Sequence, residues 1–171
     1  GMVIKDFLSE YQFHTLQKMI VWNTECPFYL DPVVAYREDG SISSDLWSWY
    51  GIHMVYYNQK SSYLLDPIMN IFGKGFGDID LLEGKTITRI KLNFYPHTPK
   101  VMEHEVHTDE GYGTTAAIFG LNTCNGFTRV KGSGKIKSVA NQLFIFDGLT
   151  DHNSSTTSNA KGRFNINFNF I

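Results

Sequence analysis

Two histidines and one aspartate carry the clearest chemistry in this sequence. His107 and Asp109 are separated by one residue, and on an extended segment that spacing directs both side chains to the same side. An imidazole and a carboxylate on one face are half of a metal site. His152 follows an apolar run and the turn-like Asp147-Gly148 pair, and it is the best candidate for a third ligand. Two histidines and one carboxylate form the facial triad that holds non-haem Fe(II) and leaves coordination positions open.

Arg163 adds a candidate anion receptor to this set. It lies beyond the turn-like segment 153–162 that follows His152. If the runs on either side of that segment pair as a hairpin, Arg163 faces the same cavity as His152, at a deeper level. A guanidinium can bind a carboxylate through two parallel hydrogen bonds and stays charged when buried. The distal carboxylate of 2-oxoglutarate would suit such a receptor.

The last strand of the chain has two chemically different faces. Its polar residues are Arg163, Asn165, Asn167 and Asn169, and they alternate with Phe164, Ile166, Phe168 and Phe170. Because side chains alternate along a strand, one face is wholly polar and the other wholly apolar. Two interpretations follow: an edge strand with one solvated face, or a strand whose polar face lines a cavity.

The order of the expected elements indicates the fold class. A helix is expected over residues 5–21, with Asp6 capping its first turn, and a second over 63–73, ending at the glycines 73, 75 and 77. A strand is expected over 50–57, and Asn125-Gly126 is the strongest hairpin signal. Further strands are expected over Thr86–Tyr95, Thr114–Leu121, Phe127–Val130, Lys135–Val139, Gln142–Phe146 and Arg163–Phe170. Helices followed by clustered short strands predict a mainly β (α+β) antiparallel sandwich or barrel with N-terminal helices packed outside it.

Composition narrows the class of protein further. The length of 171 residues favours a single domain over residues 2–171. The formal net charge of −2 provides no basic field of the kind that binds nucleic acid. Gly1 before Met2 is typical of tag removal. Cys26 and Cys124 lie far apart, which indicates a reducing compartment. No apolar run has the length of a membrane span, so we expect a cytoplasmic protein.

The ordered set of His107-x-Asp109, His152 and Arg163 resembles the signature of the Fe(II)- and 2-oxoglutarate-dependent dioxygenases. The Tyr95-Pro96 pair upstream and the apolar segments around these residues extend the resemblance over roughly residues 86–170, where we expect the barrel core. The family fold is a double-stranded β-helix, or jelly roll. The sequence looks most like the small stand-alone members of the prolyl-hydroxylase-like branch, including those of bacteriophages. A phage-encoded member would act in the host cytoplasm.

The resemblance assigns a role to each of these residues. It implies that His107, Asp109 and His152 are the catalytic iron ligands and that Arg163 receives the 2-oxoglutarate carboxylate. Tyr95 matches a family tyrosine that donates a hydrogen bond to the same carboxylate, and Asn165 shares the face of Arg163 and is expected to help to hold the co-substrate. In this branch a glycine often follows shortly after the Tyr-Pro pair, whereas here the segment is His97-Thr98-Pro99.

The resemblance also implies the chemistry and its co-substrates. Fe(II), 2-oxoglutarate and O2 would serve to hydroxylate a C–H bond with release of succinate and CO2, and ascorbate is compatible as an accessory reductant. The branch favours a peptidyl or amino-acid substrate but does not identify one. The aromatic loop with Trp47 and Trp49 either wraps onto the core or lies over the site, where it would contact the substrate. Residues Glu110–Tyr112 would lie beside the open iron positions and are candidate substrate contacts.

Two other classes of function fit the same residues. A non-enzymatic jelly-roll binding module would keep the fold without redox chemistry, and it predicts that the three ligand residues do not converge. A cupin-type metal-dependent lyase or isomerase would hold another divalent metal on the same triad, with Arg163 binding an acidic substrate.

Overall fold

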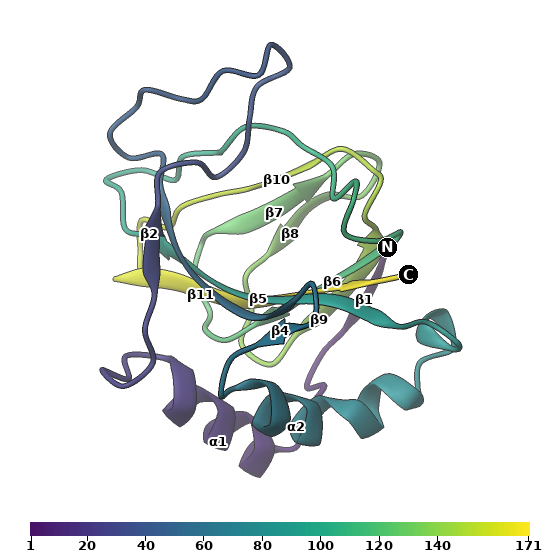
Figure 1. Cartoon of the computed structure of the whole chain (residues 1–171). Coiled ribbons are helices and arrows are strands. Elements are labelled where there is room, and N and C mark those ends of the chain that lie inside the picture. Colours follow the sequence, from purple (N-terminus) through teal and green to yellow (C-terminus); the bar gives the residue numbers. More distant parts are fainter.

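A computed structural model describes the whole chain, residues 1–171, as strands with helices packed along one side (Figure 1). The helices are α1 (Glu10–Ile20), α2 (Leu65–Gly77) and the short 3-10 helix η1 (Asp80–Leu82). The strands are β1 (Met2–Ile4), β2 (Tyr29–Asp31), β3 (Tyr50–Tyr57), β4 (Lys60–Ser61), β5 (Ile87–Pro96), β6 (Thr115–Gly120), β7 (Phe127–Val130), β8 (Gly134–Lys137), β9 (Leu143–Asp147), β10 (His152–Ser154) and β11 (Gly162–Phe170).

The strands form two antiparallel sheets. The main sheet has the order β1-β9-β6-β11-β5-β3-β2, with β4 paired to β3, and the minor sheet has the order β10-β7-β8. Figure 1 shows the two helices on one face of the main sheet and the minor sheet on the other. The predicted class, a mainly β jelly roll with N-terminal helices packed outside it, is confirmed.

Strand β11 lies in the middle of the main sheet. It pairs with β5 on one side and with β6 on the other, so the interpretation of it as an edge strand is wrong. Its apolar residues belong to the core cluster beneath the helices. Its polar face is turned towards the minor sheet, where Asn165 and Asn167 line a cavity.

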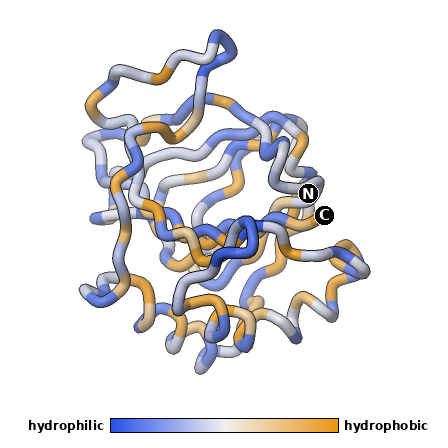
Figure 2. The backbone as a smooth tube through the Cα atoms, viewed as in Figure 1, coloured by the Kyte–Doolittle hydropathy of each residue, from blue (hydrophilic) through white to orange (hydrophobic).

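The main core fills the space between the helices and the main sheet, where hydrophobic segments of the chain gather (Figure 2). Phe72 of α2 lies 4.9 Å from Phe119 of β6 and 4.9 Å from Phe168 of β11, between ring centroids. Each buried large apolar side chain contributes roughly 1.5–3 kcal/mol through its removal from water. The helices therefore support the main sheet from behind. Its other face carries a small apolar cluster against the minor sheet beside the polar groups. No helix is long and apolar enough to cross a membrane.

The bounds of both helices differ from the prediction, at the start of α1 and at the end of α2. Ser9, not Asp6, caps α1, and its side chain and that of Gln12 form a reciprocal capping box. Helix α2 continues through Gly73 and Gly75 to Gly77. Gly75 allows a close contact, because a Cβ atom there would lie 2.7 Å from Cζ of Phe7.

The Asn125-Gly126 pair does not form the predicted hairpin. It connects β6 of the main sheet to β7 of the minor sheet, and the Asn125 side chain accepts a hydrogen bond from Ser158 N at 2.9 Å. A Cβ atom at Gly126 would lie 2.8 Å from Cδ of Arg163. The glycine therefore makes room for the arginine side chain at a crossing between sheets.

The predicted pairing of the runs around His152 and Arg163 is also wrong. Strand β10 pairs with β7 in the minor sheet, whereas β11 pairs only within the main sheet. His152 and Arg163 therefore belong to opposite sheets, and Arg163 reaches the minor sheet through its hydrogen bond to Thr128 of β7, a relation that local spacing did not predict.

Candidate metal centre and adjoining cavity

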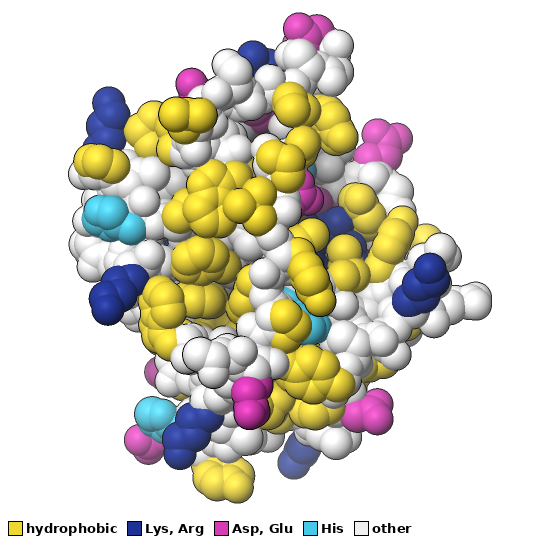
Figure 3. Space-filling view, turned by 60° about the vertical axis from the view of Figure 1, so that its left-hand side comes forward, with side chains coloured by type: hydrophobic (Ala, Val, Ile, Leu, Met, Phe, Trp, Pro, Cys, Tyr) yellow, Lys and Arg dark blue, Asp and Glu magenta, His cyan; other side chains and the backbone are white.

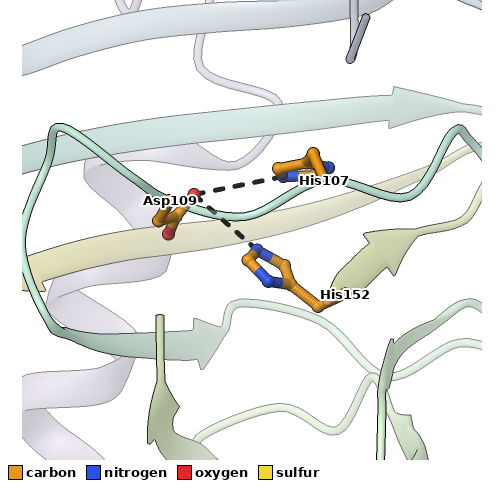
Figure 4. Close-up of side chains that lie close together, drawn as sticks. All are labelled: His107, Asp109 and His152. Atoms are coloured by element: carbon orange, nitrogen blue, oxygen red, sulfur yellow. Dashed lines mark ion pairs between the residues drawn. The ribbon is translucent and has the colours of Figure 1, made fainter. Parts of the chain in front are cut away.

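The three predicted ligand residues come together between the two sheets (Figure 4). His107 and Asp109 lie on the segment between β5 and β6, and His152 begins β10. The backbones of His107 and His152 exchange two hydrogen bonds of 2.9 Å, from each N to the other O. One ligand-type atom from each of the three side chains lies within 4.8 Å of the others, so the three side chains could hold a single metal ion.

Backbone carbonyls orient both imidazoles. Nδ1 of His152 lies 2.8 Å from the Thr150 carbonyl, and Nδ1 of His107 lies 3.4 Å from that of Glu105. A proton on each Nδ1 satisfies these carbonyls and leaves the Nε2 lone pairs free. The Nε2 atoms lie 3.7 Å (His152) and 4.0 Å (His107) from Oδ1 of Asp109. Burial, with help from the neighbouring His152, lowers the pKa of His107 to about 4, so its imidazole is neutral at neutral pH.

Asp109 is held by a network of buried polar groups. Asn169 Nδ2 donates to its Oδ2 at 2.7 Å, and Arg89 Nη2 donates to its Oδ1 at 3.5 Å. Arg89 in turn donates to Asn169 Oδ1 and lies 3.5 Å from the ring centroid of Tyr112. Burial by itself raises the pKa of Asp109, but the nearby His152 imidazole, the charge of Arg89 and the hydrogen bond from Asn169 outweigh it and hold that pKa well below its usual range. Asp109 is therefore ionised at neutral pH and suited to ligate a cation.

A cavity of about 520 Å³ extends from these residues between the sheets. From the side, charged groups are visible in a hollow bordered by hydrophobic side chains (Figure 3). Its floor is made by the polar faces of two paired strands, with Asn93 Nδ2 donating to Asn165 Oδ1 at 2.9 Å. The floor residues are Arg89, Lys91, Asn93 and Tyr95 of β5 and Asn165 and Asn167 of β11.

Arg89 and Lys91 are cavity residues that the sequence analysis missed. The signal was present, because Arg89, Lys91, Asn93 and Tyr95 alternate with the apolar Ile90, Leu92 and Phe94. This is the pattern that marked the last strand as two-faced. Strand β5 lies directly beside β11 in the sheet, so the two polar faces form one surface.

Arg163 is buried at the other end of this surface. It is 2% exposed, and its Nη1 donates to the carbonyls of Phe127 (2.8 Å) and Ser155 (3.1 Å). Its Nη2 donates to Oγ1 of Thr128 at 2.8 Å, while its Nε has no partner. Arg163 borders a smaller cavity of about 20 Å³, and Thr128 and Asn165 border both cavities.

Tyr95 lies between the metal-ligand cluster and Arg163. It lines the large cavity and pairs in register with Arg163, whose Cζ lies 5.2 Å from the tyrosine ring centroid. Burial raises the pKa of Tyr95, so the phenol keeps its proton at neutral pH and remains a donor.

Of the residues considered as substrate contacts from the sequence, only Tyr112 lines the cavity. Trp47 packs beside His104, with ring centroids 5.4 Å apart, and Trp49 lies 6.3 Å from Phe94. Neither tryptophan lines the cavity, nor do Glu110 and Gly111. Tyr112 of the expected segment does border the cavity, together with Tyr50 and residues 33–36 of the preceding loop.

Comparison with known proteins bears on the fold. No protein-family model matches the chain, and no curated protein does. Among solved structures, a prolyl hydroxylase of Trichoplax adhaerens, in complex with a peptide fragment of hypoxia inducible factor, aligns with a TM-score of 0.66 at 13% identity, over 99% of this chain and 82% of its own. A 2OG-Fe(II) oxygenase family oxidoreductase of Burkholderia pseudomallei aligns with 0.65 at 13% identity, over 92% and 78%.

A prolyl-4-hydroxylase of Pseudomonas putida aligns with a TM-score of 0.62 at 17% identity, over 99% of this chain and 90% of its own. The likeness therefore extends over nearly the whole chain, although the sequences have diverged widely. The resemblance seen in the sequence is confirmed at the level of the fold, and this chain has the double-stranded β-helix architecture of 2-oxoglutarate and Fe(II) oxygenases.

Proposed function

We propose that this protein is an Fe(II)- and 2-oxoglutarate-dependent dioxygenase that hydroxylates a C–H bond of its substrate. The observation that carries the proposal is the convergence of His107, Asp109 and His152 inside the cavity of an oxygenase-type fold. The fold alone would not identify an activity. The triad adds a specific site at the place where the two sheets face each other.

The donor set fits Fe(II). Two imidazoles and one carboxylate are the ligands of a facial triad with open positions, and the backbone carbonyls that fix both rings would act as the outer shell of such a site. When bound, Fe(II) with 2-oxoglutarate and O2 supplies the oxidising chemistry and releases succinate and CO2. The protein's part is to orient these groups and to exclude competing reactions from the cavity.

Arg163, Tyr95 and Asn165 fit the role of co-substrate receptors. Thr128, which binds the Arg163 guanidinium, pairs with Ser154, two residues from His152, so about 6.6 Å of strand separates this level from the ligand cluster. A five-carbon dicarboxylate has a comparable length. The unpartnered Nε of Arg163 is a buried donor left for an anion, and the protonated phenol of Tyr95 adds a second one.

The substrate proposed from the resemblance is a peptidyl or amino-acid group. One of the similar structures is a complex with a peptide fragment, and the cavity here is lined in part by the loop 33–36. The binding-module alternative predicted that the three ligand residues would not converge, and they do. A cupin-type lyase or isomerase shares the triad, and metal identity together with 2-oxoglutarate turnover separates it from the dioxygenase.

The direct test is 2-oxoglutarate decarboxylation by the purified protein with Fe(II) under air, measured as succinate, with and without ascorbate. We expect turnover by the wild-type protein and its loss in Asp109→Ala and His152→Ala. His97→Ala, at an exposed histidine outside the cavity, is the matched control and is expected to retain turnover. Absence of both turnover and 2-oxoglutarate binding, with unchanged metal affinity in Asp109→Ala, would refute the proposal.

A further inference from the structure

Lys91 is a cationic group in the cavity to which the proposed chemistry assigns no role. It lies in the middle of β5, and its side chain is directed into the cavity. Its Nζ donates a hydrogen bond to Oη of Tyr50 at 3.2 Å. The same Nζ lies 5.1 Å from the centroid of the Tyr50 ring. None of the ion pairs in the structure includes Lys91, so no carboxylate oxygen lies within 4.0 Å of its Nζ.

The two carboxylates near Lys91, Asp109 and Asp31, accept hydrogen bonds from other groups. Asp109 belongs to the triad and accepts from Arg89 and Asn169. Asp31 also borders the cavity, but its Oδ1 accepts from the backbone N of Val33 at 2.8 Å and so closes a local turn. Burial, together with the neighbouring charge of Arg89, lowers the pKa of Lys91 to about 7. An anion beside Nζ would reverse this effect and favour the ammonium form.

The floor around Lys91 has further unused hydrogen-bonding capacity. Asn167 lies opposite Lys91 in the β5–β11 register, and Asn93 is the next residue on the same face. The Oδ1 atoms of Asn93 and Asn167 are buried and have no partner. Buried acceptors of this kind are normally satisfied, so they are suited to N–H donors of the same ligand that brings an anion to Lys91.

Lys91 and Arg163 are separate anion receptors. Lys91 pairs with Asn167, whereas Arg163 pairs with Tyr95, four residues away along β5, which corresponds to about 13 Å of strand. Tyr50 and residues 33–36 border the same cavity as Lys91, whereas Arg163 does not border it. A co-substrate held by Arg163 would leave Lys91 free to meet the molecule that is hydroxylated.

We propose that Lys91 and Tyr50 receive a carboxylate of the primary substrate, so that this substrate is an acid such as an amino acid or the acidic end of a peptide. The inference rests on the proposed function for its assignment to the substrate. A carboxylate matches one ammonium and one phenol donor, and an adjacent N–H would satisfy the asparagine oxygens. The carboxylate receptor itself can be tested without turnover.

The test measures the accessibility of Lys91 to trace labelling with acetic anhydride, quantified by mass spectrometry. The exposed Lys135 serves as the internal reference. The probes are N-acetyl-L-leucine, N-acetyl-L-proline and propionate, each paired with its primary amide, on the wild-type protein with Mn(II) and 2-oxoglutarate. We expect at least one acid to reduce Lys91 labelling by about tenfold at saturation, while its amide has no effect and Lys135 is unchanged.

Two variants refine the outcome. Tyr50→Phe removes the second donor and is expected to weaken protection by the acid several-fold, while Tyr57→Phe, at an exposed tyrosine of the same strand, leaves it unchanged. Equal protection by acid and amide, or none by any acid into the high-millimolar range, would overturn the inference. Protection by 2-oxoglutarate alone that persists in Arg163→Met would also overturn it, because Lys91 would then serve the co-substrate.

These outcomes are distinguishable from failure of the proposed function. Selective protection by acids in a protein that does not decarboxylate 2-oxoglutarate would retain the carboxylate receptor and reject the dioxygenase. Decarboxylation without selective protection would retain the dioxygenase and reject the role of Lys91.

Discussion

At the scale of single residues, the candidate metal site depends on groups that touch its ligands as much as on the ligands themselves. Asp109 is a buried carboxylate whose two oxygens are approached by Asn169 and Arg89. The rigid β11 and β5 strands supply these partners. Because outer partners fix the orientation and charge of a ligand, they should influence metal affinity without contacting the metal.

Asn169→Ala tests this influence. Loss of the 2.7 Å hydrogen bond to Oδ2 frees the carboxylate to rotate, and we expect the affinity for Mn(II) to fall by about tenfold or more. Asn167→Ala is the matched control, since Asn167 shares the same strand face but does not contact Asp109. Titration calorimetry at constant pH measures both. Equal affinities in the two variants would contradict the positioning role of Asn169.

Glu103 gives a residue-scale prediction for stability against pH. Two hydrogen bonds from Arg129 at 2.7 and 2.8 Å, against a smaller opposing effect of burial, lower the pKa of Glu103 to about 2. A depressed folded-state pKa means that the contribution is present above the ordinary pKa of 4.5 and is lost as the pH falls towards 2.

Glu103→Gln is therefore expected to lower the free energy of unfolding by about 0.2–1 kcal/mol near neutral pH, the range of exposed ion pairs. The difference from wild type should shrink as the pH falls below 4.5. Urea denaturation over a pH series measures it, with Glu83→Gln, at an exposed glutamate, as control. A gap that stays constant down to low pH would show that Glu103 acts through packing instead.

At the scale of elements, the strands position the site and the helices support the strands. Helix α2 packs Phe72 and Phe76 against the main sheet, and Phe7 stacks on both of these rings. The ring of Phe7 also fills the space beside Gly75. Glycine is unfavourable in a helix interior by roughly 0.5–1 kcal/mol relative to alanine, so its presence here has a steric reason.

The two glycines of α2 form a matched pair for testing that reason. Gly73 has open space where a Cβ would lie, whereas a Cβ at Gly75 would lie 2.7 Å from Phe7 Cζ. Gly73→Ala is expected to raise the free energy of unfolding by about 0.5–1 kcal/mol through helix propensity. Gly75→Ala should instead lower it by roughly 1–3 kcal/mol through overpacking. Thermal or urea unfolding measures the stability of both variants. Similar stabilisation of Gly73→Ala and Gly75→Ala would show that the close approach of Phe7 is not the reason for a glycine at position 75.

At the scale of the whole molecule, the metal site joins parts of the chain that meet only when it is folded. His107 and Asp109 come from the connection between β5 and β6 of the main sheet, and His152 comes from the minor sheet. A metal ion that bridges them binds the folded state and has no equivalent site in the unfolded chain. Binding should therefore stabilise the fold by mass action.

We expect the melting temperature to rise with Mn(II) concentration, with a gain of about 2.7 kcal/mol at a hundredfold excess over Kd. For a chain of this size that gain corresponds to a shift of several degrees, at roughly 2–4 °C per kcal/mol. Asp109→Ala should abolish the shift. Scanning calorimetry measures it, and an identical shift in Asp109→Ala would place metal binding outside the triad.

The local periodicity of the strands could be derived from the sequence because it depends on neighbours in the chain. The bounds of β7, Phe127–Val130, match the prediction, and the two-faced pattern of β11 led to its correct cavity-facing interpretation. Asn125-Gly126 misled for the same local reason. Its residues favour a hairpin turn, but the apolar runs on either side of it pair with other strands and belong to different sheets.

The sequence by itself determined which residue types are available for chemistry and which strand faces are polar, since alternation and the His107-x-Asp109 spacing are properties of adjacent residues. Only the tertiary structure decided that β5 lies beside β11, that Lys91 and Arg89 share the cavity with the triad, and that Arg163 sits behind Thr128. These relations depend on pairing between distant strands. That pairing is set by the apolar faces that the main sheet buries against α1 and α2, and no local spacing contains it.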